Sequence, residues 1–398
     1  MTILHISRMN FLSDKAHVYT TTKTCEALAE QTDTQVILLS SDNSLVGESA
    51  LQSFFRKHNV KKNFEIISVS SYGNIFRGSS IRLVNWFETI AINISILRYI
   101  ILHRNTFDIL YVRDCTLFMP ILACKYILKK PIFIELHAVL HKKHGQFMNN
   151  YFSKISDGLI AISFGLREYY KHMNPNIIVA FCAAAEPERF ARIINSKEFL
   201  REELKLPRER VILMYAGNLY KTGNNDSYGL EDIVEAMVYV NDSTLFIGLG
   251  KRGNETKELE DLATHLRVDK KILFLPWVPK HMVYRYWKAA DVLMLPSSGA
   301  QIGNSPTKMF EYLSSERVII AARTKAIEEV LHHEKNALLV SDFKNPREWA
   351  AAINRVLGDH QLRDTLTKAA LQDSRKYSWN DRGYHIHEFI KQTIATKS

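Results

Sequence analysis

Short apolar runs alternate with helical patterns along the first half of the chain. The runs at residues 2–6, 35–39, 64–69, 109–112, 132–136 and 159–162 are rich in Ile, Leu and Val, which is typical of strands buried on both faces of a parallel sheet. Residues 19–29, 80–102 and 117–128 between them have the pattern of helices. This alternation predicts a doubly wound, Rossmann-like α/β domain, in which ligands lie at the carboxyl ends of the strands.

The second half repeats the alternation, with apolar runs at residues 211–219, 244–250, 272–279, 292–295 and 318–321 and a helical stretch at 346–357. A chain of 398 residues with 46% hydrophobic residues is long enough for two cores, so we expect two domains. The charged stretch 196–210 is a candidate linker. The first apolar run is not followed by a GxGxxG motif, so a tightly held dinucleotide is not expected there.

The start of one helix in the second half is well marked. Ser305 is a suitable N-cap, and the proline that follows it fits the first helical position. The free amides of Thr307 and Lys308, together with the lysine charge, predict an anion site. Glu311 lies five residues beyond Pro306, about 7 to 8 Å along the axis, where a carboxylate can accept hydrogen bonds from a ribose diol. A plain amphipathic helix with a solvated Lys308–Glu311 pair is the alternative.

The segment SPTKMFEYLSSERVIIA, residues 305–321, resembles the donor-binding segment of retaining GT-B glycosyltransferases of family four. The resemblance implies that the helix start holds a nucleotide diphosphate and that Glu311 holds the ribose. The family often carries another glutamate eight positions upstream, which binds the donor sugar, and Gly303 stands there in this chain. Asn304, Gln301 or the backbone therefore takes its place, or the sugar is held differently.

The resemblance covers nearly the whole chain and is strongest in the second half. Gly217 stands at the end of a predicted strand, where the family often continues with an arginine and, soon after, a lysine. Here these positions are Asn218 and, in a longer loop, Lys221. Lys221 and Lys308 are therefore expected to supply the positive charge for the diphosphate. Val278 lies where the backbone of the family pairs with the nucleotide base.

The segment 181–190, FCAAAEPERF, resembles the interdomain segment of the family. The resemblance implies an α/β fold of the GT-B class, two Rossmann-like, doubly wound domains facing a central cleft. Residues 1–192 would form the acceptor domain and residues 205–377 the nucleotide-sugar domain. The terminal helix, residues 378–398, is expected to pack back on the first domain.

His137 directly follows the predicted strand 132–136, where a ligand-facing side chain is expected. With His141 and His144 it also has a spacing compatible with metal ligation on a helix, but no cysteine or carboxylate at matching spacing completes a site, so no metal is predicted. The sequence ELH resembles the catalytic loop of the family, whose histidine contacts the donor sugar. His137 is therefore the predicted catalytic residue of the first domain, with Lys308 and Lys221 in the second.

Two further features of the first half have open interpretations. Arg113 follows the predicted strand 109–112 and is either an acceptor contact or the partner of Asp114 or Glu135 in a salt bridge. Residues 15–17 lie in a loop that resembles the acceptor loop of a subgroup of the family, and a plain connection between strand and helix is the alternative.

Charge and cysteine content restrict the partners and the compartment. A net charge of +10 favours acidic partners such as nucleotide diphosphates or anionic lipid, whereas no zinc-finger spacing or RNP-like motif indicates nucleic acid. The four cysteines form no CxxC pair, and no signal peptide is recognisable at the start, so a cytoplasmic location is expected. Residues 75–105 are amphipathic and predict a core helix or an interfacial membrane helix, to which the basic run 56–62 adds attraction.

The resemblance implies a hexosyltransferase that moves a sugar with retention from a UDP- or GDP-linked donor to a glycan or lipid-linked acceptor in bacterial surface polysaccharide synthesis. The sequence has no DxD motif at a strand end and no carboxylate pair of the glycosidase type. We expect no metal and no cofactor besides the donor, because helix amides and lysines neutralise the leaving diphosphate. A catalytically silent GT-B subunit that binds a glycan or a partner enzyme and a nucleotide-sugar epimerase are the alternatives.

Overall fold

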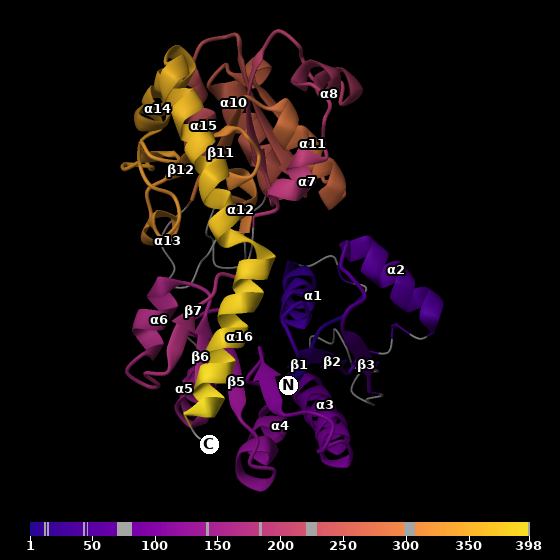
Figure 1. Cartoon of the computed structure of the whole chain (residues 1–398). Helices are drawn as coiled ribbons and strands as arrows, with labels where there is room; N and C mark the ends of the chain where they lie inside the picture. The colour runs from indigo at the N-terminus through magenta and orange to yellow at the C-terminus, as the bar shows by residue number, and fades with distance from the viewer. Residues whose placement is uncertain are drawn as a thin grey trace. The chain divides into compact units, whose positions relative to one another are not determined.

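The computed structural model describes residues 1–11, 13, 16–42, 44–45, 47–69, 82–140, 143–182, 185–219, 229–297 and 307–396. The chain forms two compact units (Figure 1). Unit 1 comprises Met1–Ala183 and Trp379–Ser398, and unit 2 comprises Ala184–Ser378. The chain therefore leaves unit 1, forms the whole of unit 2, and returns to unit 1.

Unit 1 is built on a parallel sheet of seven strands in the order β3-β2-β1-β4-β5-β6-β7. The strands are β1 (Thr2–Ser7), β2 (Gln35–Ser40), β3 (Glu65–Ser68), β4 (Ile109–Val112), β5 (Ile132–Leu136), β6 (Gly158–Ala161) and β7 (Ile177–Val179). The helices are α1 (Ala16–Ala29), α2 (Glu48–His58), α3 (Arg82–Leu102), α4 (Phe118–Leu122), α5 (Lys143–Ile155), α6 (Phe164–Tyr170) and α16 (Trp379–Ala395). A π-helical turn, Ala123–Ile127, continues α4. The strand order reverses between β1 and β4, which is the switch point where doubly wound sheets bind ligands.

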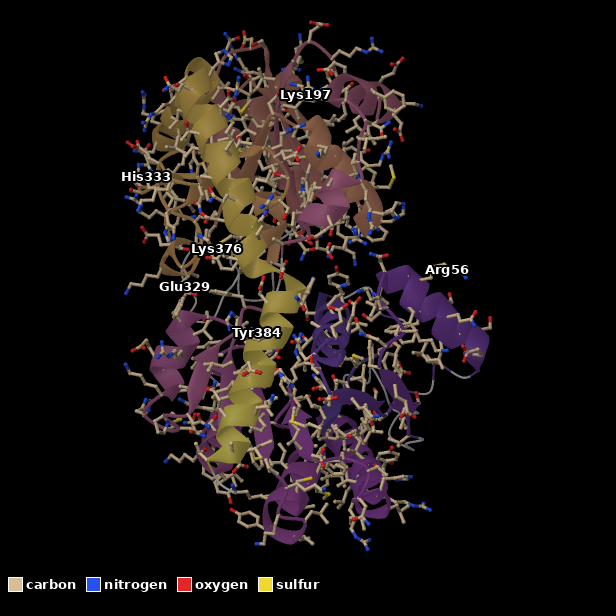
Figure 2. All side chains as sticks on the ribbon, viewed as in Figure 1. Arg56, Lys197, Glu329, His333, Lys376 and Tyr384 are labelled. Carbon is tan, nitrogen blue, oxygen red and sulfur yellow. The ribbon has the colours of Figure 1, made fainter. Side chains whose placement is uncertain are left out.

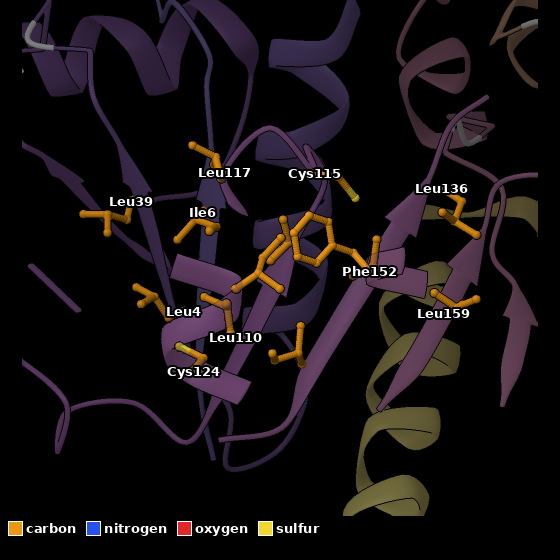
Figure 3. Close-up of a cluster of buried hydrophobic side chains, with 14 of the residues drawn as sticks. Leu4, Ile6, Leu39, Leu110, Cys115, Leu117, Cys124, Leu136, Phe152 and Leu159 are labelled. Atoms are coloured by element: carbon orange, nitrogen blue, oxygen red, sulfur yellow. The ribbon is translucent and has the colours of Figure 1, made fainter. Parts of the chain in front are cut away.

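Alternate side chains of these strands enter two buried clusters, one on each face of the sheet. Leu110 and Ile134 pack with α3 residues and with Phe152 of α5 in one cluster (Figure 3). Tyr111, which follows Leu110, and Phe133, which precedes Ile134, belong to the other cluster. Residues of α1 and α16 complete that cluster. Helices therefore cover both faces of the sheet, as the continuous apolar strands require.

Helix α16 is part of the core of unit 1. The ring of Phe389 lies 5.9 Å from the ring of Phe133 in an edge-to-face arrangement. Gly383 lies so close to the carbonyl of Ala27 that a Cβ atom there would overlap it, so the absence of a side chain lets α16 lie directly against α1. Unit 1 is thus completed by residues that follow unit 2 in the sequence.

Unit 2 has a parallel sheet of six strands in the order β10-β9-β8-β11-β12-β13. The strands are β8 (Val211–Ala216), β9 (Thr244–Gly250), β10 (Ile272–Pro276), β11 (Val292–Leu295), β12 (Val318–Ala322) and β13 (Leu338–Val340). The helices are α7 (Pro187–Ala191), α8 (Lys197–Glu203), α9 (Leu230–Ala236), α10 (Asn254–His265), α11 (Lys280–Ala289), α12 (Thr307–Leu313), α13 (Lys325–Glu328), α14 (Pro346–Gly358) and α15 (His360–Ser374). The switch point of this sheet lies between β8 and β11.

The predicted class of two Rossmann-like α/β domains is confirmed by these two parallel sheets. The prediction that residues 196–210 form a linker is wrong. Arg201 of α8 is 3% exposed and donates to the carbonyl of Ala289 at 2.9 Å and to the carboxylate of Asp291 at 2.6 Å. Lys197, labelled in Figure 2, contacts the same carboxylate at 2.7 Å. The stretch therefore belongs to unit 2, and the boundary between the units lies at residues 183 and 184 instead of 192.

None of the helices in the described part of the chain has both the length and the apolar character needed to cross a membrane. Helix α3 buries Ile92, Ile96 and Ile100 completely in the core of unit 1. Its opposite face carries exposed apolar side chains, among them Trp86 and Phe87. One side of α3 therefore belongs to the core of unit 1, as the first of the two interpretations of this stretch expects.

Candidate active site

A cavity of about 290 Å³ opens at the carboxyl ends of β1, β4 and β5 in unit 1. Its lining includes Arg8 just after β1, Arg113 after β4, and Glu135 and His137 at the end of β5. His17, near the start of α1, lies on the same cavity. The cavity is therefore at the switch point of the sheet, and Arg113 and His137 lie together in it.

Glu135 is the centre of a buried hydrogen-bond network in this cavity. Its carboxylate accepts from Arg382 of α16 at 2.6 Å, from the ring nitrogen Nε2 of His137 at 2.6 Å, and from the hydroxyl of Tyr111. Burial by itself raises the pKa of the Glu135 carboxyl, but Arg382, His137 and Arg113 hold this pKa well below its ordinary value. Glu135 is therefore an ionised carboxylate with charged and neutral donors around it.

His137 is held through both ring nitrogens. Nε2 lies 2.6 Å from Glu135 Oε1, and Nδ1 lies 3.3 Å from Nη2 of Arg113. Burial lowers the pKa of His137, and Arg113 and Arg382 lower it further, although Glu135 acts in the opposite direction. With the side chain 22% exposed, His137 is an uncharged imidazole at neutral pH that still reaches the cavity.

Arg113 ties β4 to the beginning of α1. Its Nη1 donates to the hydroxyls of Thr20 and Thr21, both at 2.9 Å, and to the backbone carbonyl of His17 at 3.2 Å. Neither Asp114 nor Glu135, both within the described residues, forms an ion pair with it, so the salt bridge considered from the sequence is not formed. Arg113 is instead a cation on the cavity wall that contacts His137.

In unit 2, Lys308 lies at the carboxyl end of β8. Its Nζ is 5.0 Å from the ring centroid of Tyr215, and a Cβ atom on Gly217 would lie 2.6 Å from Nζ. The absence of a side chain at Gly217 therefore makes room for the lysine. Gly250, at the end of β9, faces Gly217 so closely that a Cβ atom there would overlap the Gly217 carbonyl oxygen. The lack of a side chain at Gly217 therefore brings the cation of Lys308 close to the backbone that follows β8, at the switch point.

Glu311 lies one turn further along α12 and pairs with Lys280. The distance from Lys280 Nζ to Glu311 Oε1 is 2.9 Å, and the glutamate side chain is 13% exposed. Lys280 is the first residue of α11 and follows the half-buried Val278 just past the end of β10. The sequence analysis missed Lys280, although its place directly after a strand end is the signal that could have identified it.

The remaining predicted residues divide into two groups. Thr307 begins α12, and the backbone carbonyl of Asn218 accepts a hydrogen bond from the hydroxyl of Tyr215 at 3.3 Å. Outside the described residues lie several predicted positions, namely Lys15, His141, Lys221, Gln301, Gly303, Asn304 and Ser305. Among the described residues, no group of three or more His, Cys, Asp or Glu side chains is placed to hold a metal ion.

Glu135 and Arg382 are the residues of this site that the sequence analysis did not recognise as a pair. Glu135 is the single carboxylate in the apolar run IFIEL, and a charge in such a strand indicates a buried partner. Arg382 has no comparable local signal, because it stands in a polar part of α16 far away in the sequence.

The second unit is similar to a known protein family. Residues 196–373 match the family model of the glycosyl transferases group 1. The matched range contains Gly217, Asn218, Val278, Thr307, Lys308 and Glu311.

The relatives by sequence match only part of their own length. The D-inositol 3-phosphate glycosyltransferase of Xylanimonas cellulosilytica is 26% identical over 206 residues, which are 51% of this chain and 47% of that protein. The chain thus spans about half the length of this relative, and 31% of the length of a second one, from Corynebacterium urealyticum.

Solved structures match over nearly the whole chain. Anabaena Alr3699/HepE in complex with UDP has a TM-score of 0.71 at 15% identity, covering 98% of this chain and all of that one. WaaG, a glycosyltransferase involved in lipopolysaccharide biosynthesis, has a TM-score of 0.66 at 12% identity, covering 98% of this chain and 99% of that one. These matches confirm the predicted GT-B fold class.

Proposed function

We propose that the chain is a glycosyltransferase that takes a hexose from a UDP- or GDP-linked donor and transfers it, with retention, to a glycan or lipid-linked acceptor. The observation that carries this proposal is the position of Lys308, which lies across Gly217 at the switch point of a sheet within the matched residues 196–373. A cation held at the carboxyl end of a strand suits a diphosphate leaving group. The UDP bound in Alr3699/HepE supports the same ligand class.

In this proposal the residues of unit 2 bind the donor. Lys308, joined by Lys221, neutralises the charge that develops on the diphosphate as the sugar leaves, which needs no metal and no cofactor. Glu311 accepts the hydroxyl hydrogens of the ribose, and Lys280 holds its carboxylate until the nucleotide arrives. The backbone beside Val278 meets the base.

The residues of unit 1 are proposed to handle the sugar and the acceptor. The lining of the cavity beside Arg113 and His17 includes further polar side chains such as Asn149, which suit hydroxyl groups. His137 contacts the transferred sugar. A role in bacterial surface polysaccharide synthesis is supported by the likeness to WaaG.

A membrane-bound acceptor would require contact with a lipid surface, and α3 provides a candidate. Its outer face exposes large apolar side chains, and Arg98 and Arg104 are exposed beside them. The apolar residues and their exposed fractions are Trp86 59%, Phe87 54%, Ile94 54% and Leu102 66%. We therefore propose peripheral contact between this face and the inner face of the cytoplasmic membrane.

Sedimentation with vesicles tests this contact. We expect binding to anionic vesicles that weakens as salt rises, because exposed charges are screened within about 10 Å at 0.1 M salt. Trp86→Ser should reduce binding, whereas Ile127→Ser, which changes a 73% exposed side chain elsewhere in unit 1, should not. Equal binding to neutral and anionic vesicles, or none to either, would remove the proposal.

The function itself is tested with a panel of UDP- and GDP-linked sugars. We expect slow release of the free nucleotide from one donor in the absence of acceptor, and loss of this release in Glu311→Ala. Nucleotide binding in calorimetry without any release would instead favour a catalytically silent GT-B subunit, to which Gly303 and Asn218 in place of the family residues also point. A protein that binds no nucleotide and releases none would refute both proposals.

A further inference from the structure

Four side chains from three elements form one chain of hydrogen bonds in unit 1. Arg382 of α16 donates to Glu135 of β5, Glu135 contacts Nε2 of His137, and Nδ1 of His137 contacts Arg113 at the end of β4. The distances are 2.6, 2.6 and 3.3 Å in that order. The chain therefore connects the core of unit 1 with the cavity.

The chemistry of the two outer groups determines where the proton of His137 lies. An ionised carboxylate only accepts hydrogen bonds, so Nε2 of His137 must carry the proton that reaches Glu135. A guanidinium only donates, so Nδ1 must offer a lone pair to Arg113. A doubly protonated ring would set an N–H group against the N–H of Arg113. The arrangement therefore specifies one neutral tautomer.

Arg382 is the residue that holds this arrangement in place. Its side chain is 3% exposed and also donates to the hydroxyl of Thr24 at 3.1 Å and to the carbonyls of Ala180 and Phe181. The guanidinium is therefore fixed from several directions, and it fixes the carboxylate of Glu135 in turn. The hydroxyl of Tyr111 donates to Oε2 of Glu135, the same oxygen that accepts from Arg382, which leaves Oε1 for His137.

We propose that Arg382 is a positioning residue which, through Glu135, holds His137 as a neutral ring with its proton on Nε2 and an accepting lone pair at Nδ1. In the proposed transfer reaction, on which this inference rests, a sugar hydroxyl donates to Nδ1 in place of Arg113. His137 then orients the sugar as a hydrogen-bond acceptor and does not donate a proton to the leaving group.

Other titratable and charged groups surround this network. His5 of β1 stacks on the ring of Tyr111 at 4.9 Å, and Arg8 and Asp114 line the same cavity. None of these three forms an ion pair with His137 or Glu135 among the described residues. The charges that act on His137 directly are therefore Arg113, Glu135 and Arg382, which the variants below separate.

The ring nitrogens of His137 report the arrangement directly by nuclear magnetic resonance of ¹⁵N-histidine-labelled protein without substrate. The spectrum of His137→Gln identifies the signals. We expect the two-bond couplings of the Nε2–H tautomer and a titration below the ordinary histidine range. Arg382→Met should raise the pKa of His137, because it leaves the charge of Glu135 less compensated, whereas Glu135→Gln should lower it.

The opposite directions of these two shifts distinguish positioning from a merely structural ion pair. Arg382→Lys, which keeps the charge, should restore the wild-type behaviour in part, and Lys391→Met, on the exposed face of the same helix, should change nothing. If Arg382→Met does not fold, Arg382→Lys and Glu135→Gln carry the same test. An Nδ1–H tautomer in the wild type, or an unchanged pKa of His137 in the Glu135→Gln and folded Arg382 variants, would overturn the proposal.

Kinetics then link the arrangement to the reaction. In donor turnover, Arg382→Met should lower kcat and move the acid limb of the pH–rate profile to higher pH, with UDP affinity unchanged, since the nucleotide residues lie in unit 2. An unchanged acid limb would overturn the link to the reaction. Because the resonance measurement uses the free protein, its result stands even if no nucleotide sugar is consumed, so the two proposals fail separately.

Discussion

His5 makes the stability of unit 1 depend on pH in a way that can be calculated. The ring lies in β1, is 1% exposed, and stacks on Tyr111 with an interplanar angle of 29°. Its Nδ1 has no hydrogen-bond partner among the described residues. Burial lowers the pKa of His5 from 6.5 to about 4. His5 is therefore protonated near pH 6.5 in the unfolded chain but only near pH 4 in the folded chain.

The sign follows from this difference in proton uptake. The contribution of His5 is fully present above pH 6.5 and is lost as pH falls towards the folded pKa. At about 1.4 kcal/mol for each pKa unit, the loss at pH 5 is about 2 kcal/mol, and it reaches about 3 kcal/mol below pH 4. The pKa of His137 is also lowered, so it adds to the loss in the same direction.

Hydrogen exchange of the β1 and β4 amides at pH 7 and pH 5, corrected for the intrinsic rates, measures the opening free energy of unit 1. His5→Phe keeps a ring against Tyr111 but cannot titrate. We expect the wild type to lose about 2 kcal/mol more than His5→Phe between these two pH values. His103→Phe is the matched control, because His103 stacks on Tyr99 at 4.1 Å but is exposed. Equal losses in wild type and His5→Phe would refute the reasoning.

Three further predictions concern the proposed donor site and its chemistry. Glu311→Ala should weaken UDP or GDP binding ten- to a hundredfold in calorimetry, since a hydrogen bond to a charged group is worth about 1.5 to 3 kcal/mol. His137→Ala should instead retain nucleotide affinity and lose turnover. The reverse pattern would contradict both assignments. Gly250→Ala should lower the melting temperature measured by calorimetry, because its Cβ would overlap the Gly217 carbonyl, and a stable, donor-binding Gly250→Ala would contradict the close approach. Donor turnover should survive EDTA, because Lys308 supplies the positive charge, and a complete loss restored by manganese or magnesium would show that a metal is required.

The fold could be predicted from sequence wherever the strands are long and continuously apolar. The runs 109–112, 132–136 and 292–295 coincide with β4, β5 and β11, since a strand buried on both faces leaves no polar alternation to misread. β7 (Ile177–Val179) is missed because three residues after Asn-Pro-Asn are too few for a pattern. Residues 196–210 are misread as a linker because their charges suggest solvent, although Arg201 is buried among backbone carbonyls.

Only those residues of the candidate site that follow a predicted strand end or helix start could be predicted from the sequence. His137 is predicted because it directly follows an apolar strand, and Lys308 because it follows a marked helix start. Their partners are not found by the same rule. Arg382 and Glu135 are 247 positions apart, and one arginine among 52 Lys and Arg residues carries no mark of the carboxylate that it meets. Such pairs are set by tertiary packing, which a single sequence does not display.

The return of the chain to unit 1 after residue 378 has a consequence for biosynthesis. On the ribosome, every residue of unit 2 is available to fold before α16 emerges, whereas unit 1 lacks a core helix until then. During this interval the carboxylate of Glu135 has no Arg382 beside it, and Phe133 lacks the α16 side chains that pack on it. The order of assembly is therefore inverted, since domains generally fold from the N-terminus. A nascent chain stalled before α16 should have a unit 2 that is already complete and a unit 1 that still requires chaperones.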